Sequence, residues 1–345
     1  MRAPDFWAAP EPNTTTSPSL YPTLLGPLSL VYDLAGRLRR AAARPDKVAV
    51  PVICVGNLVA GGAGKTPVVL ALVKSLRDRG VAAHVLTRGY GGTEAGPLAV
   101  DPSAHDAASV GDEALLLART APTWTARDRV AGAHAAATAG AQAIVMDDGF
   151  QNPALTKDLS LLVIDGGYGF GNGRVIPAGP LRERPARGLG RADAVVIIGA
   201  DRQGITPRIP RSLTLLRADL APGPDAAGLR GRKVVAFAGI GRPQKFFDSL
   251  RGLGAELAAQ RGFPDHHPYS AADLDELRAT AKAEDAVLVT TEKDAARLSA
   301  DQRAGIAVLR VDVAWRNTVL LDALLDPIFA PPDAPSQQRG RSKRA

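Results

Sequence analysis

A glycine-rich stretch at residues 52–67 constrains this fold more than any other part of the chain. It begins with four apolar residues, 52–55, which have the length and composition of a buried parallel strand. Gly61, Gly62 and Gly64 allow a tight turn in which successive backbone N–H groups point toward one place. The apolar pattern of residues 66–76 predicts a helix whose positive end faces the same place. This order of elements predicts a site for phosphate groups.

Two polar residues after the turn indicate a nucleotide rather than a simple anion. Lys65 supplies a mobile positive charge for the β- and γ-phosphates, and the hydroxyl of Thr66 is a ligand for Mg²⁺. The spacing departs from G-x-x-x-x-G-K-[ST], because Val59 replaces the first glycine, and it is closer to the G-G-x-G-K-T variant of the P-loop. An incidental glycine turn is the alternative, but the flanking strand and helix favour phosphate binding. The predicted nucleotide-binding residues are Val59, Ala60, Gly61, Gly62, Ala63, Gly64, Lys65 and Thr66.

A pair of carboxylates at the end of another apolar segment is the predicted metal site. Residues 143–146 end in Asp147 and Asp148, the Walker B form in which an aspartate holds Mg²⁺ directly or through water. Asp165 competes for this role, since it follows the apolar residues 161–164 in the same way. We favour the doublet, because two acids can divide metal binding and substrate polarisation, whereas one aspartate at a strand end is more often a turn former.

Four further polar segments are candidates for ligand binding. Residues 87–92 (Thr-Arg-Gly-Tyr-Gly-Gly) follow a predicted strand, at the edge where open sheets bind ligands. Residues 110–113 (Val-Gly-Asp-Glu) open a helix, where carboxylates usually only stabilise the helix dipole. Residues 169–184 are rich in Gly and Pro, and irregular segments of this length are uncommon unless functional. The histidine cluster within residues 263–268 has a polar loop as its simplest interpretation, because no other metal ligands lie near it in the sequence.

The length of 345 residues exceeds what one hydrophobic core usually serves, so two domains are expected. Strands and helices alternate in both halves, which predicts an α/β fold: a P-loop NTPase-like domain with a mostly parallel sheet, and a second, smaller α/β domain. Residues 194–198 are the last strand predicted for the first sheet. The predicted segments are an irregular N-terminus at 1–19, an amphipathic helix at 20–44, the P-loop domain at 45–206, a linker at 207–231, the smaller domain at 232–330 and a disordered basic tail at 331–345.

The helix predicted at residues 20–44 has two explanations. Its apolar residues recur on one face at helical spacing, and arginines crowd its C-terminal end. A helix packed on the protein core is the ordinary explanation, while a wide apolar face beside cationic residues is also typical of a helix in a membrane interface. The residues alone favour neither. The apolar face comprises Leu24, Leu28, Val31, Ala35 and Leu38.

Charge, aromatic content and cysteine content limit the partners and the compartment. The net charge of +7 favours an anionic partner, which includes nucleotides, nucleic acids and acidic membranes, although part of the excess lies in the C-terminal tail. Aromatic residues make up only 5% and form no stacking motif, which argues against nucleic acid. Cys54 is the single cysteine, which fits a reducing cytoplasm. No run of 18 apolar residues and no signal-peptide pattern is found.

Seven short motifs occur in one order: V-G-N with G-G-A-G-K-T-P, T-R-G-Y-G, V-G-D-E, D-D-G-F-Q, P-A-G-P-L-R-E, F-P-D-H-H and T-T-E-K-D. In this order they closely resemble the tetraacyldisaccharide 4'-kinase family of lipid A biosynthesis. The resemblance extends from about residue 6 to about residue 298. Each motif is weak alone, but seven in sequence are hard to obtain by chance. Asn152 stands where the family usually has His, and Ala296 where it usually has Val.

The resemblance implies a lipid-sugar kinase that uses ATP and Mg²⁺ to phosphorylate the 4'-hydroxyl of a tetraacylated glucosamine disaccharide 1-phosphate, giving lipid IVA. It implies a peripheral position on the cytoplasmic face of the inner membrane, with the helix at 20–44 touching the bilayer. No nucleic-acid partner is expected, and a monomer is expected. The implied catalytic residues are Asp112 as general base, His266 as its orienting partner, Lys65 and Asp148. The implied substrate-binding residues are Asn57, Arg88, Tyr90, Gln151, Asn172, Arg182 and Glu183, and the implied metal ligands are Thr66, Asp147 and Asp148.

Phosphoryl-transfer chemistry supports these roles independently. A loose transition state requires mainly charge neutralisation and alignment. A carboxylate with a pKa of about 4 is a weak base toward a sugar hydroxyl, but it can accept a proton that leaves late, and a paired histidine fixes its orientation. Because His266 comes from the second domain, closure of the two domains is expected to complete the site.

Two other functions share parts of this pattern. A P-loop switch or partitioning ATPase uses the same loop to act on protein partners, but Ala60 stands where many such proteins carry a lysine. A metal-dependent phosphoesterase could use Asp265, His266 and His267, but that chemistry needs several more Asp and His motifs on strand ends, and we find none in the sequence.

Overall fold

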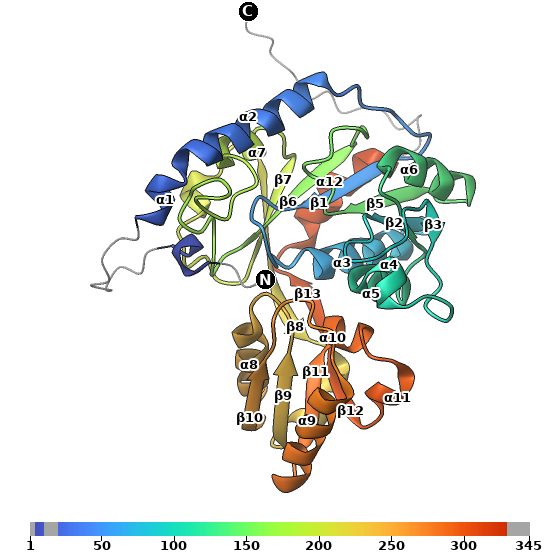
Figure 1. The fold of residues 1–345 in the computed structure, drawn as a ribbon. Helices are drawn as coiled ribbons and strands as arrows, with labels where there is room; N and C mark the ends of the chain where they lie inside the picture. The colour runs from blue at the N-terminus through green and yellow to red at the C-terminus, as the bar shows by residue number, and fades with distance from the viewer. Residues whose placement is uncertain (1–3, 10–19, 330–345) are drawn as a thin grey trace, which may run out of the picture.

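The structure is a computed structural model that describes residues 4–9 and 20–329. Figure 1 shows a large α/β body above a smaller one, with the chain crossing between them near β8 and β13. The basic tail predicted at 331–345 and most of the N-terminal segment predicted at 1–19 lie outside the described residues.

The large body is built on a nine-stranded sheet in the order β13-β8-β7-β6-β1-β5-β2-β4-β3. Every neighbouring pair from β8 to β4 is parallel, and only the edge strands β13 and β3 are antiparallel to their neighbours. The central strands are buried along their whole length, which explains why their sequences are continuous runs of apolar residues. The strands are β1 (Val52–Gly56), β2 (Ala83–Thr87), β3 (Leu98–Ala99), β4 (Thr123–Thr125), β5 (Ala143–Asp147), β6 (Leu159–Asp165), β7 (Ala194–Ile198), β8 (Thr214–Pro222) and β13 (Val311–Trp315).

Apolar side chains pack on both faces of this sheet. On one face, Ile53 of β1 shares a buried cluster with Leu72 of α3 and Leu321 of α12. On the other face, Cys54 shares a cluster with Ala133 of α6. Successive residues of β1 therefore point to opposite cores, as the pleat of a strand requires. The helices of this body are α3 (Lys65–Asp78), α4 (Ala107–Val110), α5 (Asp112–Ala118), α6 (Arg129–Thr138), α7 (Pro185–Leu189), α12 (Thr318–Phe329) and η2 (Thr206–Arg208).

The smaller body is a four-stranded parallel sheet in the order β10-β9-β11-β12, with a buried cluster on each face. Helix α10 packs against α5 of the large body, and Ala296 belongs to the cluster at that contact. The elements are η3 (Pro224–Leu229), β9 (Lys233–Ala238), α8 (Pro243–Gly252), β10 (Glu256–Gly262), α9 (Ala271–Ala283), β11 (Val287–Thr291), α10 (Glu292–Ala296), α11 (Ala300–Arg303) and β12 (Ile306–Leu309).

The large sheet is wider than predicted, and the predicted boundaries need correction. Strand β8 lies within the linker predicted at 207–231, yet it pairs in parallel with β7. Strand β13 and helix α12 lie within the smaller domain predicted at 232–330, yet β13 pairs with β8 and α12 belongs to the large core. The smaller body therefore runs only from η3 to β12. The boundaries were predicted wrongly because the residue pattern of a strand shows that it is extended and apolar but does not show which sheet it joins.

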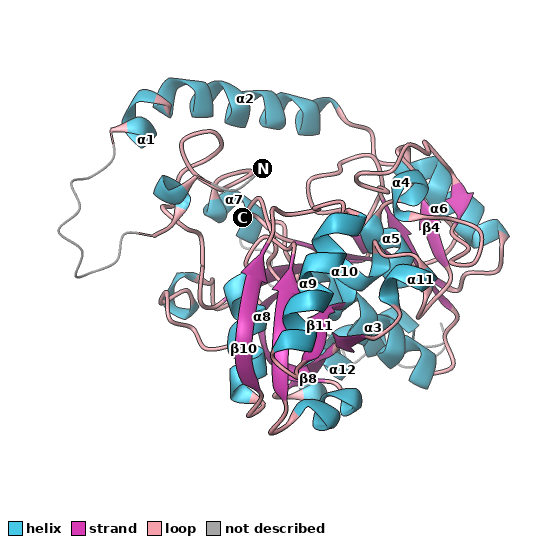
Figure 2. Ribbon diagram, turned by 60° about the horizontal axis from the view of Figure 1, so that its bottom comes forward, coloured by secondary structure: helices cyan, strands magenta, loops and turns pink. Residues whose placement is uncertain are grey.

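The helix predicted at 20–44 is present as α1 (Tyr21–Leu24) and α2 (Gly26–Ala42). Figure 2 shows α2 lying along one side of the large body. The buried residues of α2 are polar: Ser29 donates to the Val175 carbonyl at 2.7 Å, and Asp33 pairs with Arg187 at 2.6 Å. The helix therefore docks through its polar side, and its apolar side is not part of the core. The exposed apolar residues of this segment are Leu20, Tyr21, Leu24, Leu28, Leu30, Val31, Tyr32, Leu34 and Leu38.

The described part of the N-terminal segment has more order than predicted. A short helix, η1 (Asp5–Trp7), lies against the glycine-rich loop that follows β6. Trp7 Nε1 donates to the Pro177 carbonyl at 3.0 Å, and Asn172 Nδ2 donates to the Phe6 carbonyl at 2.8 Å. Within residues 4–9 and 20–329, no helix has the length and apolarity needed to cross a membrane.

Candidate active site

The turn between β1 and α3 has the geometry of a phosphate-binding loop. Gly61 and Gly64 have φ values of 117° and 83°, which residues with a Cβ rarely adopt. Asn57 Nδ2 donates to the Gly61 carbonyl at 3.3 Å, and the N–H of Ala60 donates to the Pro180 carbonyl at 2.7 Å. Because α3 begins immediately after Gly64, its unpaired N–H groups face the turn.

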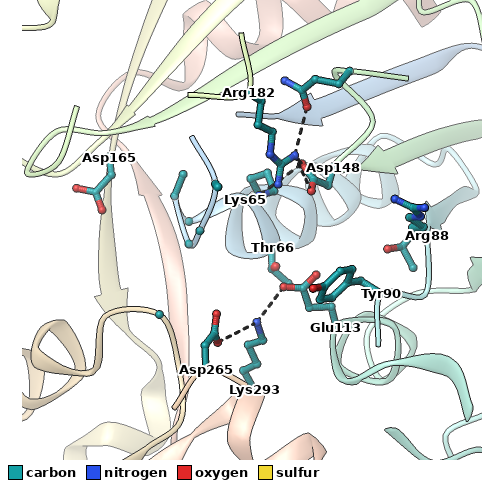
Figure 3. A pocket seen from close by; sticks show the side chains of 18 of the residues that line it. Lys65, Thr66, Arg88, Tyr90, Glu113, Asp148, Asp165, Arg182, Asp265 and Lys293 are labelled. Atoms are coloured by element: carbon teal, nitrogen blue, oxygen red, sulfur yellow. Dashed lines mark hydrogen bonds and ion pairs between the residues drawn. The ribbon is translucent and has the colours of Figure 1, made fainter. Parts of the chain in front are cut away.

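A cavity of about 1410 Å³ lies between the two bodies and α2. Figure 3 shows Lys65 and Thr66 at its centre, Asp265 and Lys293 of the smaller body on one side, and Arg88 at a separate end. The tertiary structure thus brings the separate sequence motifs to one place. The predicted residues that line the cavity are Ala60, Gly61, Gly62, Ala63, Gly64, Lys65, Thr66, Arg88, Tyr90, Asp148, Gln151, Arg182 and His266.

The two carboxylates that follow β5 have different environments. Asp148 Oδ1 lies 3.5 Å from Lys65 Nζ and 2.8 Å from Arg182 Nη1. Burial opposes ionisation of Asp148, but Lys65 and Arg182 outweigh it and lower the pKa of its carboxyl to about 2. Asp147 is 1% exposed, and its Oδ1 has no hydrogen-bond partner among the described residues. Burial, with a smaller contribution from Glu113, raises the pKa of Asp147 to about 7.

Asp112 and His266 meet across the contact between the two bodies. Asp112, the first residue of α5, is 4% exposed, and its Oδ2 lies 3.0 Å from His266 Nδ1. Burial alone would raise the pKa of Asp112, but His266, Lys293 and Arg297 together hold it well below its usual value. Because the carboxylate is ionised, His266 donates its Nδ1 proton to it and presents Nε2 on the other side.

Two basic residues that we did not predict complete this pair. Arg297 Nε donates to Asp112 Oδ2 at 2.7 Å, and Arg297 Nη1 donates to Asp294 Oδ1 at 2.7 Å. Lys293 Nζ lies 3.1 Å from Glu113 Oε1 and 3.3 Å from His266 Nε2. Both follow β11, and the T-T-E-K-D motif was the available signal for Lys293.

Asp165, the competing strand-end carboxylate, has different partners from the doublet. It lies at the end of β6 and is 4% exposed. Its Oδ2 pairs with both Arg242 and Lys245 of the smaller body. Arg242 Nη2 also donates to the Gly62 carbonyl at 2.6 Å, so these residues tie the smaller body to the phosphate-binding loop.

Several predicted residues lie behind the cavity wall and support it. Asn57, Asp112 and Asp147 are buried and are not among the lining residues, and Val59 pairs with Leu181 across an isolated β-bridge. Asn172 binds the Phe6 and Ala178 carbonyls. Glu183 is fully buried, and its oxygens accept from Arg191, both at 2.8 Å, and from Gln151 at 3.3 Å. We therefore propose that Asn57, Asn172 and Glu183 support the wall of the cavity and do not contact a substrate directly.

We expect Arg297→Gln to raise the pKa of Asp112, because it removes a cation that favours the carboxylate. In the wild-type protein the pKa of Asp112 lies well below its usual value, so protonation of Asp112 does not itself limit activity at mildly acidic pH. In Arg297→Gln the acid limb of the kcat/KM profile should move to higher pH, while Arg297→Lys should leave it near the wild-type position. The measurement is the kcat/KM profile of the wild-type protein and both variants, extended on the acid side to about pH 4, where an aspartate titrates. An unshifted limb in Arg297→Gln would contradict the expectation.

The fold and the site define this chain as a P-loop phosphotransferase, in which His266 lines the same cavity as the nucleotide loop and pairs with the buried Asp112. The profile of the family described as "Tetraacyldisaccharide-1-P 4'-kinase" matches residues 21–329, and the chain belongs to this family. Membership of this family confirms the resemblance inferred from the motifs. It also confirms the predicted class, a lipid-sugar kinase, and it does not favour a switch or partitioning ATPase.

The similarity to individual relatives extends over nearly the whole chain. A tetraacyldisaccharide 4'-kinase of Paramagnetospirillum magneticum is 56% identical over 329 residues, which cover 95% of this chain and 99% of that protein. A tetraacyldisaccharide 4'-kinase of Rhodospirillum centenum is 56% identical over 334 residues, which cover 96% of this chain and 98% of that protein. A crystal structure described as the "apo" form of LpxK from Aquifex aeolicus in complex with ATP has a TM-score of 0.74, 27% identity, and coverage of 89% of this chain and 99% of that one. The predicted fold class is confirmed.

Proposed function

We propose that this chain transfers the γ-phosphoryl group of ATP to the 4'-hydroxyl of a tetraacylated disaccharide 1-phosphate. The proposal rests on one observation: groups from both bodies come together at one cavity. The large body supplies Lys65 and Asp148 at the phosphate-binding loop, and the smaller body supplies His266 to Asp112. A P-loop ATPase that acts through protein partners does not need the pair formed by Asp112 and His266.

Asp112 is the proposed general base, and His266 is its orienting partner. His266 already donates its Nδ1 proton to Asp112 in their hydrogen bond, so Asp112 itself takes the proton of the acceptor hydroxyl while His266 keeps the carboxylate oriented. Since His266 and Arg297 both come from the smaller body, Asp112 is oriented only when the two bodies are in contact. This couples the base to closure of the cavity and to exclusion of water.

Lys65, Arg182 and Asp148 are the proposed groups at the transferred phosphoryl. In the structure the two cations share Asp148, which keeps their charges at the nucleotide end of the cavity. Both side chains are long enough to turn toward phosphate oxygens, where they would neutralise charge that develops in transfer. Tyr90 and Gln151 line the same cavity and are proposed to contact the acceptor sugar.

Mg²⁺ is proposed to be held by Thr66, Asp147 and Asp148 together with phosphate oxygens. The residues present fit such an ion, because the buried Asp147 Oδ1 has no partner among the described residues and hard cations prefer oxygen ligands. Within the described residues, no group of three or more His, Cys, Asp or Glu could hold a metal by itself. When bound, Mg²⁺ neutralises charge on the β- and γ-phosphates.

The helix pair α1–α2 is proposed to lie on the cytoplasmic face of the inner membrane. Leu24, Leu28, Val31 and Leu38 are exposed to solvent, while its polar side docks on the large body. Apolar burial at roughly 25 cal/mol per Å² gives a few kcal/mol for a handful of such side chains. Arginines near anionic headgroups would add about 1 kcal/mol each. A lipid acceptor could then keep its acyl chains in the bilayer while its sugar reaches the cavity.

Leu28→Asp combined with Val31→Asp is expected to release the protein from anionic vesicles. Leu28 is 58% exposed and Val31 is 66% exposed, so the melting temperature should change little. Vesicle flotation with anionic lipids measures the binding, and thermal melting measures the fold. Leu274→Asp in α9 is a contrasting control, because that buried residue should unfold the protein. Continued binding by the double variant, or loss of its fold, would count against the membrane proposal.

The proposed reaction itself is tested by incubating the protein with labelled ATP, Mg²⁺ and a tetraacyl disaccharide 1-phosphate. We expect label in the lipid product at the 4'-position, with none when the acceptor already carries a 4'-phosphate. ATP hydrolysis that does not depend on the lipid, with no labelled lipid, would overturn the proposal.

A further inference from the structure

Three arginines lie at the carboxyl ends of β2 and β4, at one end of the cavity. Arg88 follows β2, Arg127 follows β4, and Arg129 is the first residue of α6. All three line the cavity. We call Arg88, Arg127 and Arg129 the arginine cluster. Strand ends of a parallel sheet meet along one edge, which explains why residues of two different loops converge here.

Among the described residues, the arginine cluster carries positive charge that no direct ion pair balances, although Asp148 and Asp147 act on Arg129 at longer range. Arg127 donates to the Thr93 carbonyl at 3.1 Å, and Arg129 Nη1 donates to the Ala126 carbonyl. Among the described residues, none of the three arginines is within ion-pair distance of a carboxylate. By contrast, most other cations of the cavity are paired: Arg40 with Glu183, Lys65 and Arg182 with Asp148, Arg242 and Lys245 with Asp165, and Lys293 with Glu113.

Arg129 is the buried member of the arginine cluster, whereas Arg88 and Arg127 are exposed. It is 5% exposed, and its Nε has no hydrogen-bond partner among the described residues. A buried guanidinium without a direct ion pair is unfavourable, and an anion that pairs with it removes part of that cost. Burial, followed by repulsion from Arg88, outweighs the opposing effects of Asp148 and Asp147 and lowers the pKa of Arg129 to about 10, which leaves it charged at neutral pH.

The position of the arginine cluster separates it from the nucleotide phosphates. Figure 3 shows Arg88 well apart from Lys65, with Asp148 and Tyr90 between them and Asp165 at the opposite end. The phosphates of ATP have their own cations in Lys65 and the α3 N-terminus. An acceptor of this family carries a phosphate at position 1 of its disaccharide, on the sugar that does not react. A bound acceptor therefore brings an anion into the cavity away from the reacting hydroxyl.

We propose that Arg88, Arg127 and Arg129 form the subsite for the phosphomonoester of the acceptor, with Arg129 as its buried anchor. Arg127 and Arg88 close on the phosphate from the exposed side. This inference rests on the proposed kinase function. It adds which residues bind the phosphate at the anionic end of the acceptor. Phosphate held here would place the disaccharide along the cavity, with its distal sugar directed toward Asp112 and Asp148.

The test compares two acceptors that differ only in this phosphate: the disaccharide 1-phosphate and the same disaccharide with a free 1-hydroxyl. We expect Arg127→Gln to reduce the ratio of their kcat/KM values roughly 10- to 100-fold, because one partner of a charged contact is lost. The KM for ATP should stay unchanged. Arg129→Met should reduce the ratio further, and since it is buried, its melting temperature is measured alongside. Arg251→Gln on α8, an arginine that does not line the cavity, is the matched control and should behave as wild type.

Each other outcome overturns the inference in a recognisable way. An equal loss on both acceptors would assign Arg127 a structural or catalytic role, and a raised KM for ATP would assign the arginine cluster to the nucleotide. Inhibition by free inorganic phosphate that disappears in Arg127→Gln, with an unchanged acceptor ratio, would show a site for free phosphate instead. If the wild-type protein phosphorylates neither acceptor, the proposed function itself fails. If it phosphorylates both equally well, only the subsite fails.

Discussion

Lys65→Ala is expected to lower kcat by about 10²- to 10³-fold and to leave the melting temperature near the wild-type value. Lys65 lies in the first turn of α3, and its Nζ is 3.5 Å from Asp148, so its charge sits beside the predicted phosphates. It belongs to none of the buried apolar clusters that hold the large body together. Thr66→Ala should act in the same direction, since it removes a proposed ligand of Mg²⁺. Steady-state rates with saturating ATP and acceptor measure both effects.

Lys74→Ala is the matched control for this experiment. Lys74 lies on the same helix but is exposed and does not line the cavity, so its removal should leave kcat unchanged. A folded Lys65→Ala protein with near-wild-type turnover would remove the basis for the nucleotide site.

Asp112→Ala and His266→Ala are each expected to lower kcat by about 10²- to 10⁴-fold. The two side chains share one hydrogen bond at 3.0 Å, and the base depends on its partner for orientation. The double variant should therefore be little worse than the worse single variant, because groups that act as one unit are not additive. The four proteins are compared by kcat and KM for both substrates, and melting temperatures show that each is folded.

His267→Ala is the control for the second substitution. His267 is the next residue in the chain, but its Nε2 lies 3.2 Å from Asp273 of α9 and not from Asp112. It should keep near-wild-type turnover. Losses that multiply in the Asp112 and His266 double variant would mean that the two residues act separately, and His266 would then be an ordinary residue of a polar loop.

The sequence predicted the two α/β units and the phosphate-binding loop because both depend on neighbouring residues. The run at residues 52–67 contains the strand, the glycines and the helix start within one short segment, so its conformation follows from local preferences. The same argument predicted Asp147 and Asp148 at a strand end. The widths of the sheets were not predictable in this way, because β8 and β13 join the large sheet through partners distant in the sequence.

The residues that sequence reasoning missed have partners on other elements. Arg297, Arg127 and Arg129 are ordinary arginines in a chain with 42 Lys and Arg, so composition gives no reason to select them. Their importance appears only when Arg297 is seen to bind Asp112, and when Arg127 and Arg129 are seen to line the cavity without an ion pair among the described residues. A single residue's role depends on which charges surround it, and those charges come from separate loops.

By itself, the sequence determined the order of strands and helices, the nucleotide loop, the candidate acids and the family resemblance. These features follow from short-range patterns in which each residue constrains its neighbours. Only the tertiary structure decided that Asp112 and His266 meet, that the arginines gather at one strand edge, and that the apolar side of α2 faces outward. Helical periodicity fixes which residues share a face, but the surface against which that face lies depends on the packing of the whole chain.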